Sequence, residues 1–453
     1  MKYDAIIIGT GQAGPSLAAS LASHGLKVAI IEKADLGGTC VNTGCTPTKA
    51  YMASARRVFM ARSSEPLGVR IKGSVEVDLK IIKNRKDNIV NDSKTGLKKL
   101  FDSNEHITLI QGKASFTDDS SLEVNGETYY ADKFYINVGA KPSIPKGFEN
   151  INYLTNESIL ELEEVPEHLM IVGGGYVGLE FGQMFSRFGS KVTILERGSQ
   201  LLKKEDPEFG EAIQNILEQE GITIALNSEC TKTEQQGHQI TVKVNAGERV
   251  ISGSHILLAT GRQPNTQDLG LEHTSVNLND KGYIDVDDEL KTSAEHIWAL
   301  GDCNGQGAFT HTAYNDCQIV ISHLFEDRKR YVSDRFTCYA AFIDPPIARV
   351  GMNRADLKAA GIKAKIATKS MSEIARAKEM GETHGLLNIY IECKSNKFLG
   401  ATFLGVGADE FIHLILDQMY ANQDYKVLRD AVHIHPTVSE LLPTMLENLK
   451  PLD

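Results

Sequence analysis

Two of the seven cysteines, Cys40 and Cys45, lie close enough along the chain to form a reversible disulfide. They belong to a glycine-rich run, residues 37–49, that reads Gly-Gly-Thr-Cys-Val-Asn-Thr-Gly-Cys-Thr-Pro-Thr-Lys. The thiolate is the reactive form of cysteine, and its pKa falls beside cations and helix N-termini. Residues 48–61 have a helical pattern, which would place Cys45 near the start of a helix and Lys49 one turn further on. The pair therefore favours thiol–disulfide exchange over a static bridge, which is uncommon in a cytosolic chain.

Two segments have the pattern of a strand, a glycine turn, a helix and a second strand that ends in an acid. The interval from the first glycine to the closing acid is 23 positions in both segments. This is the fingerprint of a dinucleotide-binding unit, in which the glycines allow a pyrophosphate to approach a helix N-terminus. Its repetition predicts two dinucleotide sites, and so two cofactors that act in series. The residues concerned are Gly9, Gly11, Gly14 and Glu32 in residues 3–32, and Gly173, Gly175, Gly178 and Glu196 in residues 169–196.

The closing acids bear on the choice of cofactor. Glu32 is expected to accept hydrogen bonds from ribose hydroxyls in the first site. In the second site, a carboxylate at Glu196 accepts from a 2′-hydroxyl and repels a 2′-phosphate, which favours NAD(H) over NADP(H). Arg197 follows immediately and could turn toward a phosphate, so NADP(H) stays an alternative.

Length and composition bound the class of protein. With 453 residues the chain exceeds what one core usually spans, and about three domains are expected. Apolar residues make up 42% and charged residues 24%, which is typical of a globular protein. The formal net charge of −11 argues against nucleic acid and anionic membranes as partners, because both need clustered Lys and Arg. No secretory signal and no membrane-spanning stretch is recognisable, so a cytoplasmic protein is expected.

The run from Gly37 to Lys49 resembles the active-site signature of the class I pyridine nucleotide-disulfide oxidoreductases, which include dihydrolipoamide dehydrogenase, glutathione reductase and mercuric reductase. The resemblance extends along the whole chain. It implies FAD and NAD(P)H as cofactors and an α/β fold with two Rossmann-like dinucleotide-binding domains plus an α+β C-terminal interface domain. The expected boundaries are 1–148 for the first part of the FAD-binding domain, 149–265 for the NAD(P)-binding domain, 266–333 for the second part of the FAD-binding (central) domain, and 334–453 for the interface (dimerisation) domain.

By this resemblance the two cysteines have different roles. Cys45 is the thiol next to the flavin, with which it forms a charge-transfer contact when reduced, and Cys40 is the interchange thiol that attacks the substrate. Lys49 resembles the lysine beside flavin N5. Tyr176 resembles the tyrosine that gates the nicotinamide pocket, and Glu180 resembles the glutamate that pairs with the flavin-side lysine. A salt bridge between Lys49 and Glu180 is therefore predicted.

Later segments resemble other places where the family binds its cofactors. Gly261 ends the strand and turn at which the chain returns to the flavin domain. Asp302 falls where the family's aspartate binds the ribitol of FAD. Thr310 and His311 fall where the family's backbone contacts the isoalloxazine, through amides rather than side chains.

The segment Ile136–Ala140 departs from the family pattern. Relatives usually have Ala-Thr-Gly-Ser there, and this chain reads Ile-Asn-Val-Gly-Ala. The turn glycine, Gly139, is kept and the threonine is lost, which weakens specific claims about that edge of the site. Thr39 and Gly112 complete the expected cofactor-binding set, and no metal site is predicted.

From about residue 336 the chain resembles the family's interface domain, on which two-fold dimers form. Within residues 432–440, His435 and Glu440 resemble the pair in which a histidine oriented by a glutamate reaches into the partner subunit's disulfide site. A histidine can take a proton from an attacking thiol and return it to a leaving one, and a carboxylate fixes its tautomer. The sequence therefore predicts a homodimer whose active site is shared between subunits.

The expected reaction passes electrons between NAD(P)H, FAD, the Cys40–Cys45 disulfide and a small-molecule or protein-bound dithiol/disulfide substrate, as in dihydrolipoamide dehydrogenase. The C-terminal segment of mercuric reductases differs from that of this chain: it has a tyrosine in place of His435 and ends in a cysteine pair. The threonines of residues 42–48 look like a divergent branch often grouped with mercuric reductase, so metal-ion reduction stays an alternative. A diaphorase or quinone reductase is a third possibility, and the retained cysteines and the pair of His435 and Glu440 argue against it.

Overall fold

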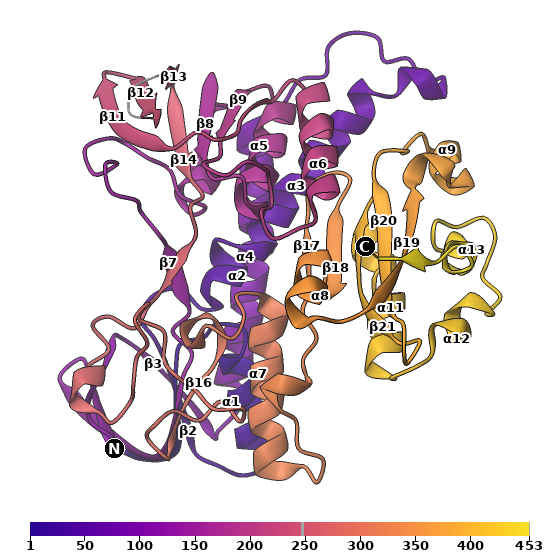
Figure 1. Cartoon of the computed structure of the whole chain (residues 1–453). Coiled ribbons are helices and arrows are strands. Elements are labelled where there is room, and N and C mark those ends of the chain that lie inside the picture. The colour runs from indigo at the N-terminus through magenta and orange to yellow at the C-terminus, as the bar shows by residue number, and fades with distance from the viewer. Residues whose placement is uncertain (246–248, 453) are drawn as a thin grey trace.

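The computed structural model describes residues 1–245 and 249–452, and its first sheet holds the first dinucleotide unit (Figure 1). In the second half of the first strand, alternate residues face opposite layers, and this explains why residues 5–8 are an unbroken apolar run. Ala5 and Ile7 pack with the helices that cover one face, whereas Ile6 and Ile8 pack with residues 269–299 on the other. The strands, in sheet order, are β3 (Ile107–Gln111), β2 (Val28–Glu32), β1 (Lys2–Ile8) and β6 (Glu127–Ile136), all parallel, then β5 (Ser121–Val124) and β4 (Ala114–Asp118), both antiparallel, with β16 (Ile297–Ala299) parallel to β6.

The second sheet repeats the same local order of strand, glycine turn, helix and strand. The chain leaves the first sheet through β7 (Ala140–Pro142) and returns through β15 (Arg262–Pro264), which pairs antiparallel with β7. The predicted α/β fold with two dinucleotide-binding units is therefore confirmed. The elements are the parallel strands β10 (Thr223–Ala225), β9 (Lys191–Leu195), β8 (His168–Val172) and β14 (His255–Leu258), the helices α5 (Tyr176–Phe188) and α6 (Pro207–Gln219), and the antiparallel strands β11 (Cys230–Gln236), β12 (Gln239–Val244) and β13 (Arg249–Gly253).

Glycine is required at matching positions of the two units. Gly9 and Gly173 have φ of +104° and +114°, which side chains rarely adopt. At Gly14 and Gly178, a Cβ would lie 2.4 Å and 2.1 Å from the carbonyl oxygens of Gly9 and Gly173. Each helix can therefore start close against its strand, as the fingerprint requires.

A helical hairpin, formed by α3 (Cys45–Arg62) and α4 (Leu79–Asp102), packs against both units. The helix predicted over residues 48–61 is present and begins earlier, at Cys45. Tyr51, Met52 and Ala55 on this helix belong to the same apolar core as α5 and β8. Further helices are α1 (Gly14–Ser23), α2 (Gly38–Asn42) and α7 (Thr310–Phe325).

The C-terminal part is an antiparallel sheet that Figure 1 shows in orange and yellow beside the nucleotide-binding units. Across the described ranges, no helix combines the length and the apolar character that a bilayer span needs. In sheet order the strands are β17 (Cys338–Ala341), β18 (Ile347–Gly351), β21 (Phe398–Leu404), β20 (Leu386–Glu392), β19 (Ala364–Ser370) and β22 (Lys450–Pro451), and the helices are α8 (Arg354–Ala360), α9 (Ala375–Met380), α10 (Ala408–Phe411), α11 (His413–Tyr420), α12 (Tyr425–Arg429) and α13 (Leu442–Leu446).

A buried charge cluster joins this C-terminal part to the second unit. The guanidinium of Arg187, on α5, lies 2.7 Å from Glu220 and 2.6 Å from Asp344. Gln183, one turn earlier on α5, donates to the carbonyl of Asp344 and accepts from its amide, both at 2.7 Å. Arg56 on α3 also contacts Asp344. Three segments that are distant in sequence are thus fixed around one carboxylate.

Replacing Arg187 with Leu should lower the free energy of unfolding by about 3 kcal/mol, because removing one partner leaves a buried charge uncompensated at Glu220. Urea unfolding followed by circular dichroism measures this change. The matched control is Arg197→Leu, at an exposed arginine, which should change the unfolding midpoint little. Equal midpoints for the two variants would contradict this account of the cluster.

Candidate active site

The cysteine pair lies at the start of α3. Cys45 is the first residue of that helix, and Cys40 lies in the short helix α2 just before it. Both cysteines are free rather than joined in a disulfide, and their side chains are hydrogen-bonded to each other. The first turn of α3 has no acidic residue and no side-chain cap, so the partial positive charge of its N-terminus acts on Cys45. This arrangement stabilises a thiolate at Cys45.

The two thiols differ in acidity. The hydrogen bond from Cys40 lowers the pKa of Cys45 to about 6, against the effect of burial, and the Thr310 hydroxyl and the charge of Lys49 add to the lowering. The Thr310 oxygen lies 3.2 Å from the Cys45 sulfur. The same hydrogen bond to Cys45 raises the pKa of Cys40, and burial acts in the same direction. At neutral pH Cys45 is therefore the thiolate and Cys40 keeps its proton.

The predicted salt bridge between Lys49 and Glu180 is confirmed. Lys49 Nζ lies 2.9 Å from Glu180 Oε2, and the glutamate is buried. Its other oxygen accepts a hydrogen bond of 2.8 Å from the backbone amide of Phe342, and the Lys49 ammonium lies 4.5 Å from the centre of the Phe342 ring. Three segments meet at Glu180, which orients the lysine one turn after Cys45.

An aromatic cluster lies at the start of α5. Tyr176 is its first residue, and its ring centre is 5.8 Å from that of Phe309. Phe309 stacks on both His311 and Tyr339, with 5.4 Å between ring centres in each case. Sequence reasoning found Tyr176 and His311 but missed Phe309 and Tyr339. Phe309 could have been found from its position before Thr310, whereas Tyr339 comes from β17 and carries no local signal.

The two closing acids hold the glycine turns. The Glu32 carboxylate accepts hydrogen bonds from the amide and hydroxyl of Thr10, at 2.9 and 2.6 Å, and from the amide of Ala34, at 2.9 Å. The backbone carbonyl of Glu32 accepts from the amide of Gly112 at 2.8 Å. Glu196 accepts from the amides of Gly174 and Gly198, at 2.7 and 2.6 Å. Thr10 occupies both lone pairs of Glu32 Oε2, whereas Glu32 Oε1 and the two oxygens of Glu196 accept one hydrogen bond each. These three oxygens can each accept one more, so the predicted contacts with ribose stay compatible with this geometry.

Asp302 lies in the turn after β16 and faces Arg262. Arg262 Nε is 3.5 Å from Asp302 Oδ2, and the same guanidinium contacts the Thr39 hydroxyl and the carbonyl of Ala140. Burial raises the pKa of Asp302, and the charge of Arg262 opposes that shift. Arg262 thus joins Thr39, next to Cys40, to the second flavin motif. Arg262 directly follows the predicted Gly261, but the sequence did not predict its side-chain contacts.

The remaining predicted glycines lie at turns. Gly139 precedes β7 and Gly261 precedes β15, with φ of +66° and +116°, and a Cβ at either would meet open space. Gly175 directly precedes α5 and is equally open. Gly11 is closer packed, because a Cβ there would lie 3.1 Å from the Asn137 side chain.

His435 and Glu440 contact each other but not the cysteines of their own chain. His435 Nδ1 lies 3.0 Å from Glu440 Oε2, and the histidine side chain is 76% exposed. Figure 1 shows the segment between α12 and α13 on the side of the C-terminal sheet away from α2. Val432 and Ile434 beside the histidine are 100% and 81% exposed. The pair is thus formed and faces outward.

These features match known proteins along almost the whole chain. Residues 3–317 match the model of the pyridine nucleotide-disulphide oxidoreductases, and residues 337–446 match the dimerisation domain of the same group. The chain belongs to the pyridine nucleotide-disulphide oxidoreductase family. Members of this family are FAD-dependent and use a pyridine nucleotide, and the dimerisation domain supports a homodimer.

Relatives in this family differ in what they are named for. The probable pyridine nucleotide-disulfide oxidoreductase RclA of Escherichia coli K12 is 35% identical, over 99% of this chain and 100% of the relative. A mercuric reductase of Staphylococcus aureus is 34% identical over 91% of this chain and 76% of its own, and a dihydrolipoyl dehydrogenase of the same species is 30% identical over 97% and 95%. A solved structure of RclA, an HOCl-induced flavoprotein disulfide reductase, has a TM-score of 0.90 at 34% identity and covers 99% of this chain and 100% of its own.

The residues present fit the two dinucleotides of the family. Helices α1 and α5 both begin at a glycine turn, without a side-chain cap and without an acidic residue in the first turn. Such N-termini favour the negative charge of a pyrophosphate. The N-terminus of α1 is therefore suited to the pyrophosphate of FAD, and the N-terminus of α5 to the pyrophosphate of a nicotinamide dinucleotide.

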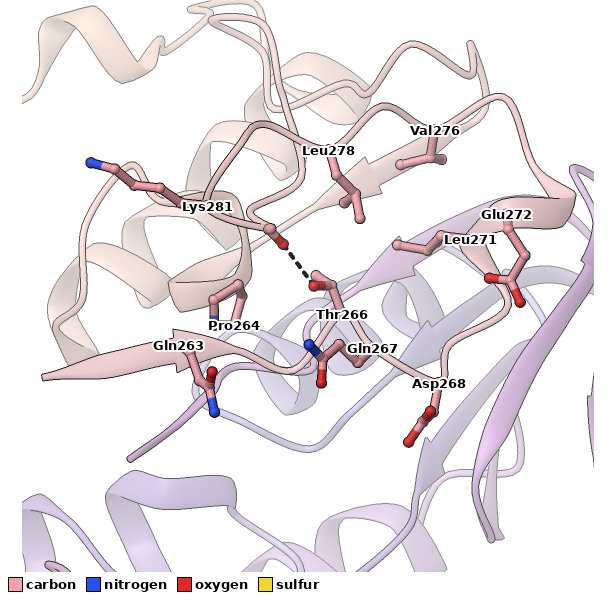
Figure 2. A pocket seen from close by; sticks show the side chains of 11 residues that line it. Gln263, Pro264, Thr266, Gln267, Asp268, Leu271, Glu272, Val276, Leu278 and Lys281 are labelled. Atoms are coloured by element: carbon pink, nitrogen blue, oxygen red, sulfur yellow. Dashed lines mark hydrogen bonds between the residues drawn. The ribbon is translucent and has the colours of Figure 1, made fainter. Parts of the chain in front are cut away.

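A separate cavity of about 420 Å³ is lined by residues of β15 and of the segment that follows it (Figure 2). Thr266, Asp268 and Lys281 are among its eleven lining residues. None of those eleven is a predicted site residue, and Asp268 is instead paired with Lys113 at 3.4 Å. This cavity is not part of the cysteine site.

Replacing Thr310 with Val should raise the pKa of Cys45 from about 6 by about 1. The physical reason is that a hydrogen bond to a charged group contributes about 1.5 kcal/mol, and one pKa unit corresponds to about 1.4 kcal/mol. Because the thiolate is lost as the pH falls through this pKa, alkylation of Cys45 in the reduced protein should decline at a higher pH. Thr310→Ser keeps the hydroxyl and should behave as the original protein. Identical profiles for Val and Ser would show that the hydroxyl is not involved.

Proposed function

We propose that this family member, acting as a homodimer, uses NADH and bound FAD to reduce a Cys40–Cys45 disulfide, and that the resulting dithiol reduces a disulfide substrate. The observation that carries the proposal is the position of Cys45 at the N-terminus of α3, with the Thr310 hydroxyl beside its sulfur and Lys49 one turn further on, held by Glu180. A stable thiolate at Cys45 suits a flavin-side role, and a protonated Cys40 suits a thiol that is activated only when substrate is present.

Bound FAD would supply the transfer of two electrons from the nicotinamide to the disulfide. On the protein side, Lys49, held by Glu180, stabilises the negative charge at Cys45 after the disulfide opens. Tyr176, backed by Phe309, covers the start of α5, where the nicotinamide is expected. Thr39 and Asp302, joined through Arg262, place the loop of Cys40 against the flavin-binding turn.

The exchange with substrate then needs a base for Cys40. His435 of the partner subunit takes the Cys40 proton, and the Cys40 thiolate attacks one sulfur of the substrate disulfide. The leaving sulfur receives that proton. Cys45 next attacks Cys40, which releases the second substrate thiolate and restores the Cys40–Cys45 disulfide, so two electrons pass to the substrate. The exposed His435, oriented by Glu440, supports this role because it is available to a second subunit.

Reduction of a thiol-binding metal ion is the second candidate. Two observations favour it: mercuric reductases are among the similar proteins, and RclA has also been solved as a Cu(II) complex, with a TM-score of 0.90. A soft metal ion binds thiolates, and Cys45 supplies one. This reaction needs no base for a leaving thiol, which separates it from disulfide reduction experimentally.

We also propose NADH as the preferred donor. Glu196 holds the second glycine turn through two amides, and its carboxylate disfavours a 2′-phosphate at the same place. Arg197 is exposed beside it and could oppose this preference.

Replacing His435 with Ala should lower disulfide turnover about 100-fold or more, because general acid–base catalysis contributes about that factor. Reduction of the flavin by NADH should change less than about twofold. Stopped-flow measurement of the two half-reactions, with lipoamide and glutathione disulfide as substrates, separates them. Equal losses in both half-reactions would contradict the role of His435. His433→Ala, two residues away, is the matched control.

The same His435 variant distinguishes the two candidate functions. If a metal ion is the substrate, NADH-dependent reduction of Hg(II) or Cu(II) should proceed at the rate of the original protein in His435→Ala. Efficient metal reduction together with no measurable disulfide reduction by the original protein would replace the disulfide proposal with the metal-ion one.

Replacing Glu196 with Ser should reduce the preference for NADH over NADPH about tenfold, mainly through KM for NADPH, because the repulsive carboxylate is removed. Comparing kcat/KM for the two nucleotides measures the preference. Arg197→Ala should leave NADH use unchanged and should lower any residual use of NADPH. An original protein that prefers NADPH would show that Glu196 does not set the choice.

A further inference from the structure

The turn that carries Asp302 is held by three buried side chains, none of which belongs to the predicted site. Gly301 has φ of +75°, so this turn is a tight bend that leads directly out of β16. Ala299, Leu300 and Gly301 each have a backbone group that is hydrogen-bonded to a buried side chain, and each of these side chains is at most 6% exposed. The three bonds are Asn304 Nδ2 to the Ala299 carbonyl (3.0 Å), Asn137 Nδ2 to the Leu300 carbonyl (2.9 Å), and the Gly301 amide to Asp316 Oδ2 (2.7 Å).

Asn137 also connects this turn to the first glycine turn. Its Oδ1 accepts a hydrogen bond of 3.1 Å from the amide of Gly14, the first residue of α1. Asn137 lies in the segment Ile136–Ala140, where the chain departs from the usual family residues. One amide side chain thus ties the two halves of the predicted flavin site together.

Asp316 extends the connection to the C-terminal part of the chain. While Asp316 Oδ2 holds the Gly301 amide, its Oδ1 accepts from the guanidinium of Arg335. Arg335 lies between α7 and β17, just before the match to the dimerisation domain begins, and its side chain is 11% exposed. It also donates to Asn315 at 2.9 Å. Burial raises the pKa of Asp316, and the charge of Arg335 opposes this shift.

We propose that Arg335 and Asp316 are positioning residues for FAD, through which the start of the C-terminal domain fixes the turn of Asp302 and so sets how tightly FAD is held. The proposal rests on the proposed contact between Asp302 and the ribitol of FAD. Arg335 binds one oxygen of the Asp316 side chain and thereby orients the other oxygen toward the Gly301 amide. Loss of Arg335 therefore weakens the bond that orients the next residue, Asp302.

A purely structural ion pair would behave differently. Its loss would lower the stability of the fold without a specific effect on the flavin. A positioning role predicts weaker FAD binding while the fold is intact. It also predicts that the two residues act as one unit, so that their effects on FAD affinity do not add.

The test measures FAD dissociation constants by flavin fluorescence, after removal and return of FAD to the full-length protein. Arg335→Met and Asp316→Asn should each weaken FAD binding about tenfold, and the double variant should be no weaker than the weaker single variant. Arg335→Lys keeps the charge and should recover part of the affinity. Asp288→Asn is the matched control, because Asp288 binds Ser333 in the same junction without touching the turn. Circular dichroism confirms that each variant is folded.

A variant of Asp302 tests separately the proposed contact of Asp302 with FAD and the coupling through Arg335. If Asp302→Ala weakens FAD binding while Arg335→Met, Arg335→Lys and Asp316→Asn bind FAD as the original protein does, the coupling through Arg335 is wrong. If Asp302→Ala also has no effect, the proposed contact of Asp302 is wrong and the coupling fails with it. An equal loss in Asp288→Asn would also overturn the proposal, because it would show general loosening of the junction.

Discussion

The salt bridge between Lys49 and Glu180 is the contact on which the rest of the site depends. Lys49 lies one turn after Cys45 on α3, and Glu180 lies one turn after Tyr176 on α5. Pairing them holds the starts of two helices from different units side by side, so the thiolate and the second glycine turn face a common space. The buried glutamate needs a second partner, and the amide of Phe342 provides it from the C-terminal part of the chain.

Residues 342–344 join the C-terminal part of the chain to α3 and α5. Phe342 binds Glu180, and Asp344, two residues later, is enclosed by Gln183, Arg187 and Arg56. The loop between β17 and β18 therefore contacts both helices of the site, whereas the segment between α12 and α13, which contains the exposed His435, lies on the opposite side of the C-terminal sheet. In the proposed mechanism, the dithiol site is complete only when a second copy supplies the histidine. The dimerisation domain is, on this account, part of the catalytic unit.

The sequence predicted the features that have a local signature. The two glycine units repeat with the same spacing, and both folded as expected, since turn geometry and helix packing depend on neighbouring residues. The cysteine loop and the pairing of Lys49 with Glu180 followed from the family resemblance. The contacts of Asn137 and Arg335, and the hydroxyl of Thr310, were not predicted, because they join residues of different elements and leave no periodic trace. Neither the sequence nor the structure identifies the substrate, since similar proteins of the same family are named for different reactions.

The most direct test of the proposed electron path is an anaerobic titration of the yellow protein with NADH, followed by absorbance at long wavelength. A Cys45 thiolate beside the flavin should give a long-wavelength thiolate-to-flavin band in the two-electron reduced protein. The band should be absent in Cys45→Ser. Cys40→Ser keeps the thiolate at Cys45 and has no disulfide to reduce, so it should show the band before NADH is added, while its flavin is oxidised. Absence of the band from the original protein, or its persistence in Cys45→Ser, would contradict the account.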